Sequence, residues 1–251
     1  MKTKLFVFAL ALSTVEFSAQ AQVLELGARY WQMKPSGSAA VGVDGLEGTE
    51  IDIQDDLGYG QEEKVIGFDA KVGSGVELAV SHLALDLKAR NRIERQIRFS
   101  DRTYRASADV ESSLEAALWR LAFRFTTGGY GFRGGLQAGA QYVELEAALS
   151  ARGYGSASED ANAALPVIGA LLQFEPAPFF RLDAGIAGGA WDFGEINVTF
   201  WDAEANALIL LRPFFVGAGY RQISIDGDET SIPLEADLTF KGFQILGGLA
   251  F

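Results

Sequence analysis

The sequence of 251 residues lacks cysteine altogether and contains a single histidine. Without cysteine the chain forms no disulfide and no thiolate metal site. One histidine makes zinc sites and histidine-dependent catalytic sites hard to assemble. Basic residues are also scarce, 21 against 33 acidic ones, and the net charge of −12 argues against a nucleic-acid surface. We therefore expect no cofactor, no metal and no nucleic-acid partner.

Long apolar runs are missing as well. Beyond the first residues, no stretch approaches the ~20 apolar residues of a membrane helix. Yet 49% of the residues are hydrophobic, and the mean hydropathy is +0.12. This combination excludes a helical membrane protein but suits a chain that meets lipid in another way.

The N-terminus has the form of a secretory signal. Two lysines, an apolar run and a pair of small residues follow one another in the order that export signals require. We expect residues 1–21 to be a signal peptide, and residues 22–251 to form one exported domain.

After position 22, polarity alternates in segments that end at glycine, proline, serine or acidic clusters. This period of two predicts an all-β chain of antiparallel strands joined as hairpins. We expect ten strands, with eight as the alternative, at residues 23–33, 64–73, 75–91, 107–126, 131–150, 163–176, 179–192, 196–210, 213–226 and 233–251. Short connections alternate with long polar ones at 34–63, 92–106, 151–162 and 227–232. Tight turns at one end and long loops at the other predict an up-and-down transmembrane β-barrel of the bacterial outer membrane.

The two faces of several strands exchange polarity along their length. In the last strand, Phe243 and Phe251 share a face that becomes Asp237 and Lys241, while the opposite face changes from Gln244 to apolar residues. Five other strands do the same, at 75–91, 107–126, 131–150, 196–210 and 213–226. A β-bulge in each strand is the alternative explanation. We expect instead that the barrel extends above the outer leaflet, where its exterior is polar and its interior apolar.

The residue at the exchange is often an amphipathic aromatic on the outward face. These residues predict an interfacial belt at Tyr30, Trp119, Tyr142, Trp201 and Tyr220. From the belt to the tight turns, the strands have the ~9 to 11 residues that a tilted strand needs to cross the hydrocarbon.

Below the belt, the inward face carries charges of both signs. This lumen charge network consists of Glu25, Arg29, Asp69, Lys71, Arg120, Arg124, Arg133, Arg181, Asp183, Asp202, Glu204 and Arg221. A barrel of this size is nearly filled by its own side chains. A selective pore would show an excess of one sign, so we expect a paired polar plug.

Above the belt, the inward face is apolar. It predicts a hydrophobic chamber lined by Trp31, Leu85, Leu114, Leu118, Val143, Leu145, Phe200, Ile223, Leu238 and Phe240. The leading hypothesis is a non-enzymatic barrel that binds or passes a small hydrophobic ligand through this half. The alternative is a structural or surface-interaction barrel whose interior is packed and transports nothing.

No catalytic residues are predicted. The single histidine, His82, falls on the outward face near the belt, away from Ser81 on the other face. A hydrolase is therefore the third hypothesis, and a glycosidase that uses only carboxylates stays open.

Two outer loops carry charge clusters. The first, 34–63, is acidic and suits Ca²⁺ only weakly, because its spacing fits no EF-hand. The second is basic and suits contact with the anionic head groups of lipopolysaccharide; its cluster is Lys88, Arg90, Arg92, Arg95, Arg98, Arg102 and Arg105. Ordinary solvated loops are the alternative in both places.

Residues 22–251 resemble the small outer-membrane β-barrel proteins of Gram-negative bacteria, the broad OmpA-barrel and OmpW-like group. The resemblance rests on the export signal, the alternating strands, the tight turns and the final segment Phe243-Gln-Ile-Leu-Gly-Gly-Leu-Ala-Phe251. It implies a place in the outer membrane, partners in outer-membrane lipid and lipopolysaccharide, and Phe251 as a signal for the barrel-assembly machinery. Ten strands rather than eight depart from the pattern of the group, so its ligands are not carried over.

Overall fold

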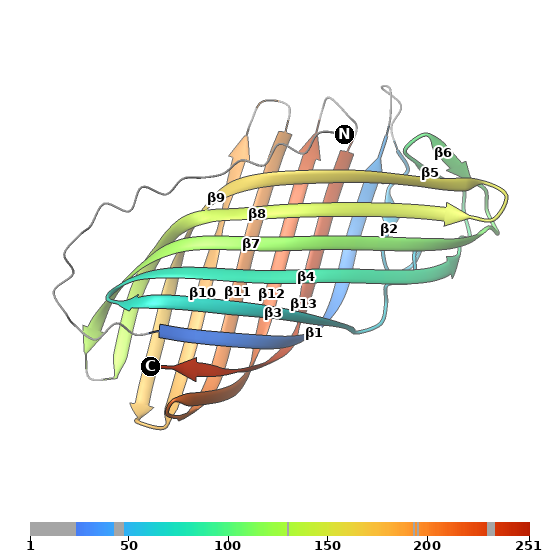
Figure 1. Cartoon of the computed structure of the whole chain (residues 1–251). Helices are drawn as coiled ribbons and strands as arrows, with labels where there is room; N and C mark the ends of the chain where they lie inside the picture. The colour runs from blue at the N-terminus through green and yellow to red at the C-terminus, as the bar shows by residue number, and fades with distance from the viewer. Residues whose placement is uncertain (1–23, 43–47, 130, 193, 195, 230–233) are drawn as a thin grey trace, which may run out of the picture.

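The computed structural model describes residues 24–42, 48–129, 131–192, 194, 196–229 and 234–251. The expected signal peptide at residues 1–21 lies outside the described residues. Within them, ten long strands form one antiparallel sheet, and the last strand pairs with the first to close it (Figure 1). In barrel order these strands are β1 (Leu24–Val41), β3 (Glu63–Ser74), β4 (Val76–Arg92), β7 (Asp109–Gly129), β8 (Phe132–Ala151), β9 (Gly155–Ala177), β10 (Phe180–Asp192), β11 (Ile196–Leu211), β12 (Phe214–Glu229) and β13 (Leu234–Ala250). The predicted ten-stranded up-and-down barrel is confirmed.

One end of the barrel is closed by very short connections. A single residue, Gly75, joins β3 to β4, and two residues at 130–131, 178–179 and 212–213 join the other three pairs. Gly75 has a φ of 76° and Gly131 a φ of 77°, a left-handed conformation that residues with a Cβ adopt only at a cost. Glycine at these two positions therefore permits the tight turns.

Two strands are much longer than the sequence predicts, and the loop boundaries at 34–63 and 151–162 are wrong. The boundary at 227–232 is also wrong, because β12 continues to Glu229. β1 continues to Val41 because residues 34–41 pair with β13, and β9 begins at Gly155 because its first residues pair with β8. These segments are rich in serine, glycine and alanine, so they carry little alternation. Their neighbours in the sheet supply the backbone partners that make them strands.

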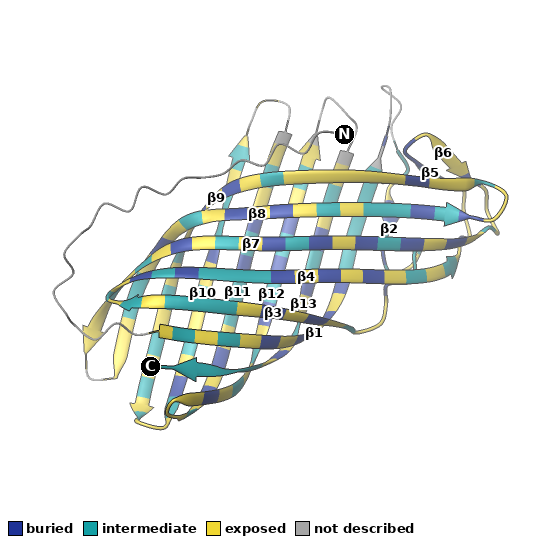
Figure 2. Ribbon diagram, in the orientation of Figure 1, coloured by how far each residue is buried: buried dark blue, intermediate teal, exposed yellow. Residues whose placement is uncertain are grey.

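The exchange of faces occurs in continuous strands. The pairing of β12 with β13, of β7 with β8 and of β4 with β7 runs through it without a register shift. The sole shift recorded among the described barrel strands lies elsewhere, between β9 and β10 beside Phe180. The alternative of one bulge per strand is therefore wrong, and the exposed and buried bands alternate along each strand (Figure 2).

The lower part of the wall presents apolar side chains to the outside. Ile66, Ile168 and Phe243 are 71%, 73% and 74% exposed. A continuous band of this kind on a closed barrel is a lipid-facing surface. The described residues hold no helix that is long and apolar enough to cross a membrane.

Four of the five predicted belt residues, Tyr30, Trp119, Tyr142 and Tyr220, are between 37% and 41% exposed, and Trp201 is half-buried. All five lie on the outward face. Trp119 is the cross-strand partner of Tyr142 on one side and of His82 on the other. The interfacial role of these rings stays a prediction.

The two longest outer loops fold into a cap, which we define as residues 48–62 and 93–108. It contains β2 (Ile51–Asp52), β5 (Ile97–Phe99) and β6 (Arg102–Tyr104). Its buried residues pack with the outer ends of three barrel strands in a hydrophobic cluster that is separate from the one inside the barrel. This cluster consists of Ile51, Ile93, Ile97, Phe99, Tyr104, Val110, Leu149, Ala151 and Ala157. The Tyr104 hydroxyl donates to the Leu149 carbonyl at 2.8 Å. The cap is thus a folded part of the barrel.

Candidate functional site

The apolar half of the interior is packed. Nine of the ten residues of the predicted chamber are buried, and Leu145 is half-buried against them. Trp31 and Phe200 have no exposed surface at all. The same cluster includes Ile53 and Tyr59 of the cap. The apolar side chains therefore run without interruption from the middle of the barrel into the cap.

An ionic layer lies directly below this cluster. Asp202, whose side chain is 4% exposed, accepts from Arg120 at 2.8 Å and from Arg221 at 2.8 and 2.9 Å. The Arg221 guanidinium lies 5.6 Å from the ring of Trp31, and that of Arg120 lies 5.8 Å from the ring of Phe200. These cation–π contacts join the ionic layer to the apolar cluster.

Arg29 forms a second centre in the same layer. It pairs with Asp69 at 2.7 Å and with Glu204 at 2.9 Å, and it donates to Gln244 at 3.1 Å. Gln244 in turn donates to Asn206 at 2.7 Å. Three strands that are distant in sequence, β1, β11 and β13, are connected through this one arginine.

A third centre lies nearer the tight turns. Glu25 accepts from Arg181 at 3.1 Å and from Lys71 at 3.4 Å, and Arg181 also lies 2.9 Å from Asp183. The two remaining residues of the predicted network, Arg124 and Arg133, belong to none of these three centres. Arg124 donates to Gln137 at 3.3 Å, whereas Arg133 is exposed.

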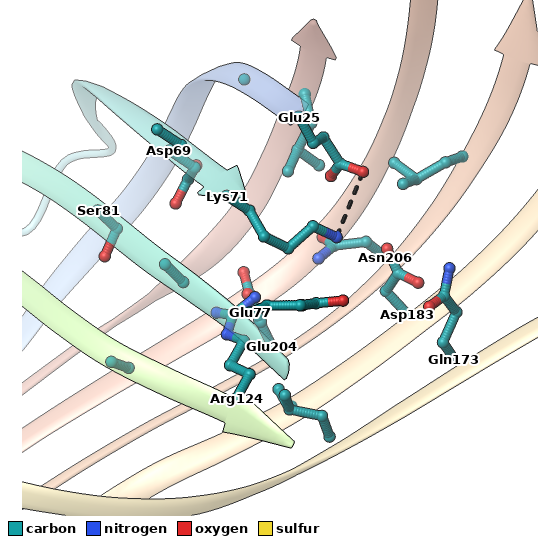
Figure 3. A pocket seen from close by; sticks show the side chains of 18 of the residues that line it. Glu25, Asp69, Lys71, Glu77, Ser81, Arg124, Gln173, Asp183, Glu204 and Asn206 are labelled. Carbon is teal, nitrogen blue, oxygen red and sulfur yellow. Dashed lines mark ion pairs between the residues drawn. The ribbon is translucent and has the colours of Figure 1, made fainter. Parts of the chain in front are cut away.

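A cavity of about 140 Å³ separates these centres. Figure 3 shows side chains that line it from β1, β3, β4, β7, β9, β10 and β11, with the Glu25–Lys71 ion pair among them. Its lining is mostly polar and includes Ser81, Gln173 and Asn206, none of which belongs to the predicted lumen charge network. Gln173 and Asn206 are both cross-strand partners of Asp183. Aligning the neighbouring strands with β10 would therefore have identified them as lumen residues. This space lies in the charged half, below the packed apolar residues.

His82 lies among aromatic rings on the outside of the barrel. Its ring centroid is 4.0 Å from that of Trp119 and 5.2 Å from that of Phe68. The described residues contain no group of three or more histidine, cysteine or acidic side chains arranged to hold a metal ion.

Two arginines of the basic cluster have acidic partners on a different segment of the chain, one between the two loops and one between the strands β4 and β7. Arg95 donates to Asp56 and to the carbonyl of Glu50, and Arg90 pairs with Glu111. The hydrogen bond from Arg95 to Asp56 raises the pKa of that guanidinium. Part of the basic cluster predicted to meet lipopolysaccharide therefore fastens the cap, while the acidic residues Asp44 and Glu47 lie outside the described residues.

No protein-family model and no curated protein match this chain. Among solved structures it is similar to the outer membrane protease OmpT of Escherichia coli, with a TM-score of 0.55 and 10% identity over 91% of this chain and 96% of that one. It also matches Ail, the attachment invasion locus protein of Yersinia pestis, with a TM-score of 0.42 and 11% identity over 92% and 99% of the two chains. The Pseudomonas putida toluene transporter TodX gives a TM-score of 0.38 and 8% identity over 93% and 91%. The likeness to OmpT shows a shared fold, that of an outer-membrane β-barrel.

Proposed function

We propose that this protein is a non-enzymatic barrel of the bacterial outer membrane that conducts nothing and acts through its outer surface. The tight turns face the periplasm, and the cap faces outward. The observation that carries the proposal is the apolar cluster, which joins the cap above to the ionic layer below through Trp31 and Phe200. A route for a solute would require buried residues from six or more strands to separate.

The same packing favours this role over the passage of a small hydrophobic molecule. Binding sites for such molecules are concave and largely preformed, whereas these apolar side chains are already in contact with one another. Phe240 is 3% exposed and Leu118 is 7% exposed.

An enzymatic role lacks support in the described side chains. OmpT is a protease, but His82 of this chain lies among lipid-facing aromatic rings and has no place beside a nucleophile. We also propose contacts with lipid and lipopolysaccharide. Lys34, Lys64 and Lys241 support them, because all three are exposed within four residues of the apolar band. Phe251, 62% exposed at the end of the chain, is proposed as the signal for the barrel-assembly machinery.

Conductance of the purified full chain in planar bilayers tests the closed interior. We expect no discrete channel currents. A titration with a hydrophobic fluorescent dye runs beside it, on the native chain and on Phe240→Arg. Saturable dye binding that Phe240→Arg abolishes, or steady channel currents, would overturn the proposal in favour of transport. A matched exposed variant, Phe243→Arg, controls for dye adsorbed to the outer wall.

A further inference from the structure

The barrel wall has an open strand edge above the membrane. β9 pairs with β10 only from Ile168 to Ala177, where the partners run from Gly188 to Phe180. Its first thirteen residues, 155–167, pair with β8 on one side, and no strand that pairs with them on the other side is described. The cap contacts this segment through side chains, with the Ser100 hydroxyl donating to Glu159 at 2.5 Å. In Figure 1 this part of β9 forms the border of the front sheet. An edge of this length presents a row of backbone donors and acceptors that another strand can pair with.

Pro166 indicates which backbone groups face the opening. It is the cross-strand partner of Ala140 in a register that continues unbroken on both sides. A proline has no N–H, so it fits such a position only when its nitrogen points away from the neighbouring strand. The residues of the same parity, Ser158, Asp160, Asn162 and Ala164, therefore direct their backbone N–H and C=O groups toward the open edge.

A row of carboxylates runs across the sheet to this edge. Asp86 is the cross-strand partner of Glu115, Glu115 of Glu146, and Glu146 of Asp160. All four side chains are exposed on the outward face. Like charges directly opposite one another on neighbouring strands destabilise a sheet. Asp160 ends the row at the edge. A positive side chain on an added strand, opposite Asp160, would therefore reduce the repulsion between the carboxylates.

The geometry points to β9 residues 155–165 as a docking site for an extended, basic segment of another protein, which adds to the sheet as an eleventh strand. Eleven residues span about 36 Å at ~3.3 Å per residue. Main-chain hydrogen bonds would hold the segment, and a lysine or arginine opposite Asp160 would select it. A second copy of this chain fits poorly, because it would bring the same acidic row to the same edge. The inference deepens the proposed surface role by naming the partner's chemistry.

The test uses the full chain in nanodiscs of zwitterionic lipid. The probe is a fluorescent ten-residue peptide of alternating lysine and valine, and a glutamate–valine peptide is its control. We expect saturable binding of the lysine peptide, measured by fluorescence anisotropy. Asp160→Lys should weaken it roughly fivefold by reversing one cross-strand pair, and Asn162→Pro by a similar factor by removing one edge donor. Asp237→Lys, an exposed acid on the distant β13, should change binding less than about twofold.

Location is checked with a thiol, since the chain has no cysteine of its own. The peptide carries a terminal cysteine activated as a pyridyl disulfide, so that a protein thiol captures it by exchange and releases pyridinethione. Ser158→Cys should capture this peptide, and Ser224→Cys on β12 should not. Far-UV circular dichroism confirms that each variant folds. Binding that is unaffected by Asp160→Lys and Asn162→Pro, an absence of saturable binding, or β9-mediated dimers of the free protein would each overturn the inference. Because conductance tests the closed interior separately, failure here leaves the proposed function intact.

Discussion

Replacing Asp202 by asparagine should destabilise the barrel by removing a buried charge that two arginines share. Asp202 is held between two buried guanidinium groups, Arg120 and Arg221, whose side chains are 11% and 8% exposed. The asparagine side chain keeps the size of the original but removes its charge. Two like charges are then left facing each other just below the apolar cluster, where water has little access. Removing one partner from a buried ion pair typically costs about 3 to 5 kcal/mol.

The measurement is reversible unfolding in urea of the barrel folded into phospholipid vesicles, followed by the fluorescence of its four tryptophans. Asp226→Asn is the matched control, because Asp226 is an exposed acid on β12, and it should change the free energy of unfolding by less than about 0.5 kcal/mol. Combining Asp202→Asn with Arg120→Gln should recover part of the loss, since it removes one of the two stranded charges. A loss below about 1 kcal/mol for Asp202→Asn would refute the view that this carboxylate neutralises the layer.

Other variants probe the remaining parts of the barrel. Ile168→Arg should cost about 2 to 4 kcal/mol in lipid, because its side chain is exposed in the apolar band; no loss in vesicle unfolding would contradict a lipid-facing site. Phe200→Ala should cost about 3 to 5 kcal/mol in the same assay by leaving a void in the packed cluster. If it costs less than the same change at an exposed phenylalanine, the interior is not packed. Lys34 and Lys241 are directly opposite on β1 and β13, so the double change to glutamine should stabilise the barrel in uncharged detergent by about 0.2 to 1 kcal/mol, and a stability loss would argue against repulsion. Burial raises the pKa of Tyr104 above its ordinary value of 10.0. The cap should therefore keep full stability below about pH 10 and lose stability as the pH rises further. Proteolysis of the cap should become faster above that pH, and Tyr104→Phe should prevent the acceleration.

The strands and their faces were predictable because the signal is local. A strand places successive side chains on opposite faces, so parity in the sequence separates Gln244 in the lumen from Phe243 and Lys241 on the outside. The polarity of the outward residues then separates the lipid-facing Phe243 from the water-facing Lys241. The exchange of faces near Trp119 and Tyr142 was read from the same alternation, and the unbroken register of β7 with β8 agrees with it.

The outer ends of the strands could not be predicted in the same way. Residues 34–41 and 155–162 are small or polar on both faces, so nothing local distinguishes them from a loop. Their strand conformation depends on β13 and β8, which supply backbone partners. The fold of the cap depends likewise on contacts such as that of Tyr104 with Leu149, 45 residues away.

The order of residues along the chain thus determined the class of fold, the count of membrane strands and the sign of each face, because these follow from a period of two. Tertiary structure alone decided where space remains. The apolar half became a filled cluster and the charged half kept a cavity, since side-chain packing depends on which strands meet across the lumen. The open edge of β9 has the same origin. β10 continues to Asp192 in its pairing with β11 but stops pairing with β9 at Gly188, and a strand's own residues do not specify where its neighbour diverges from it.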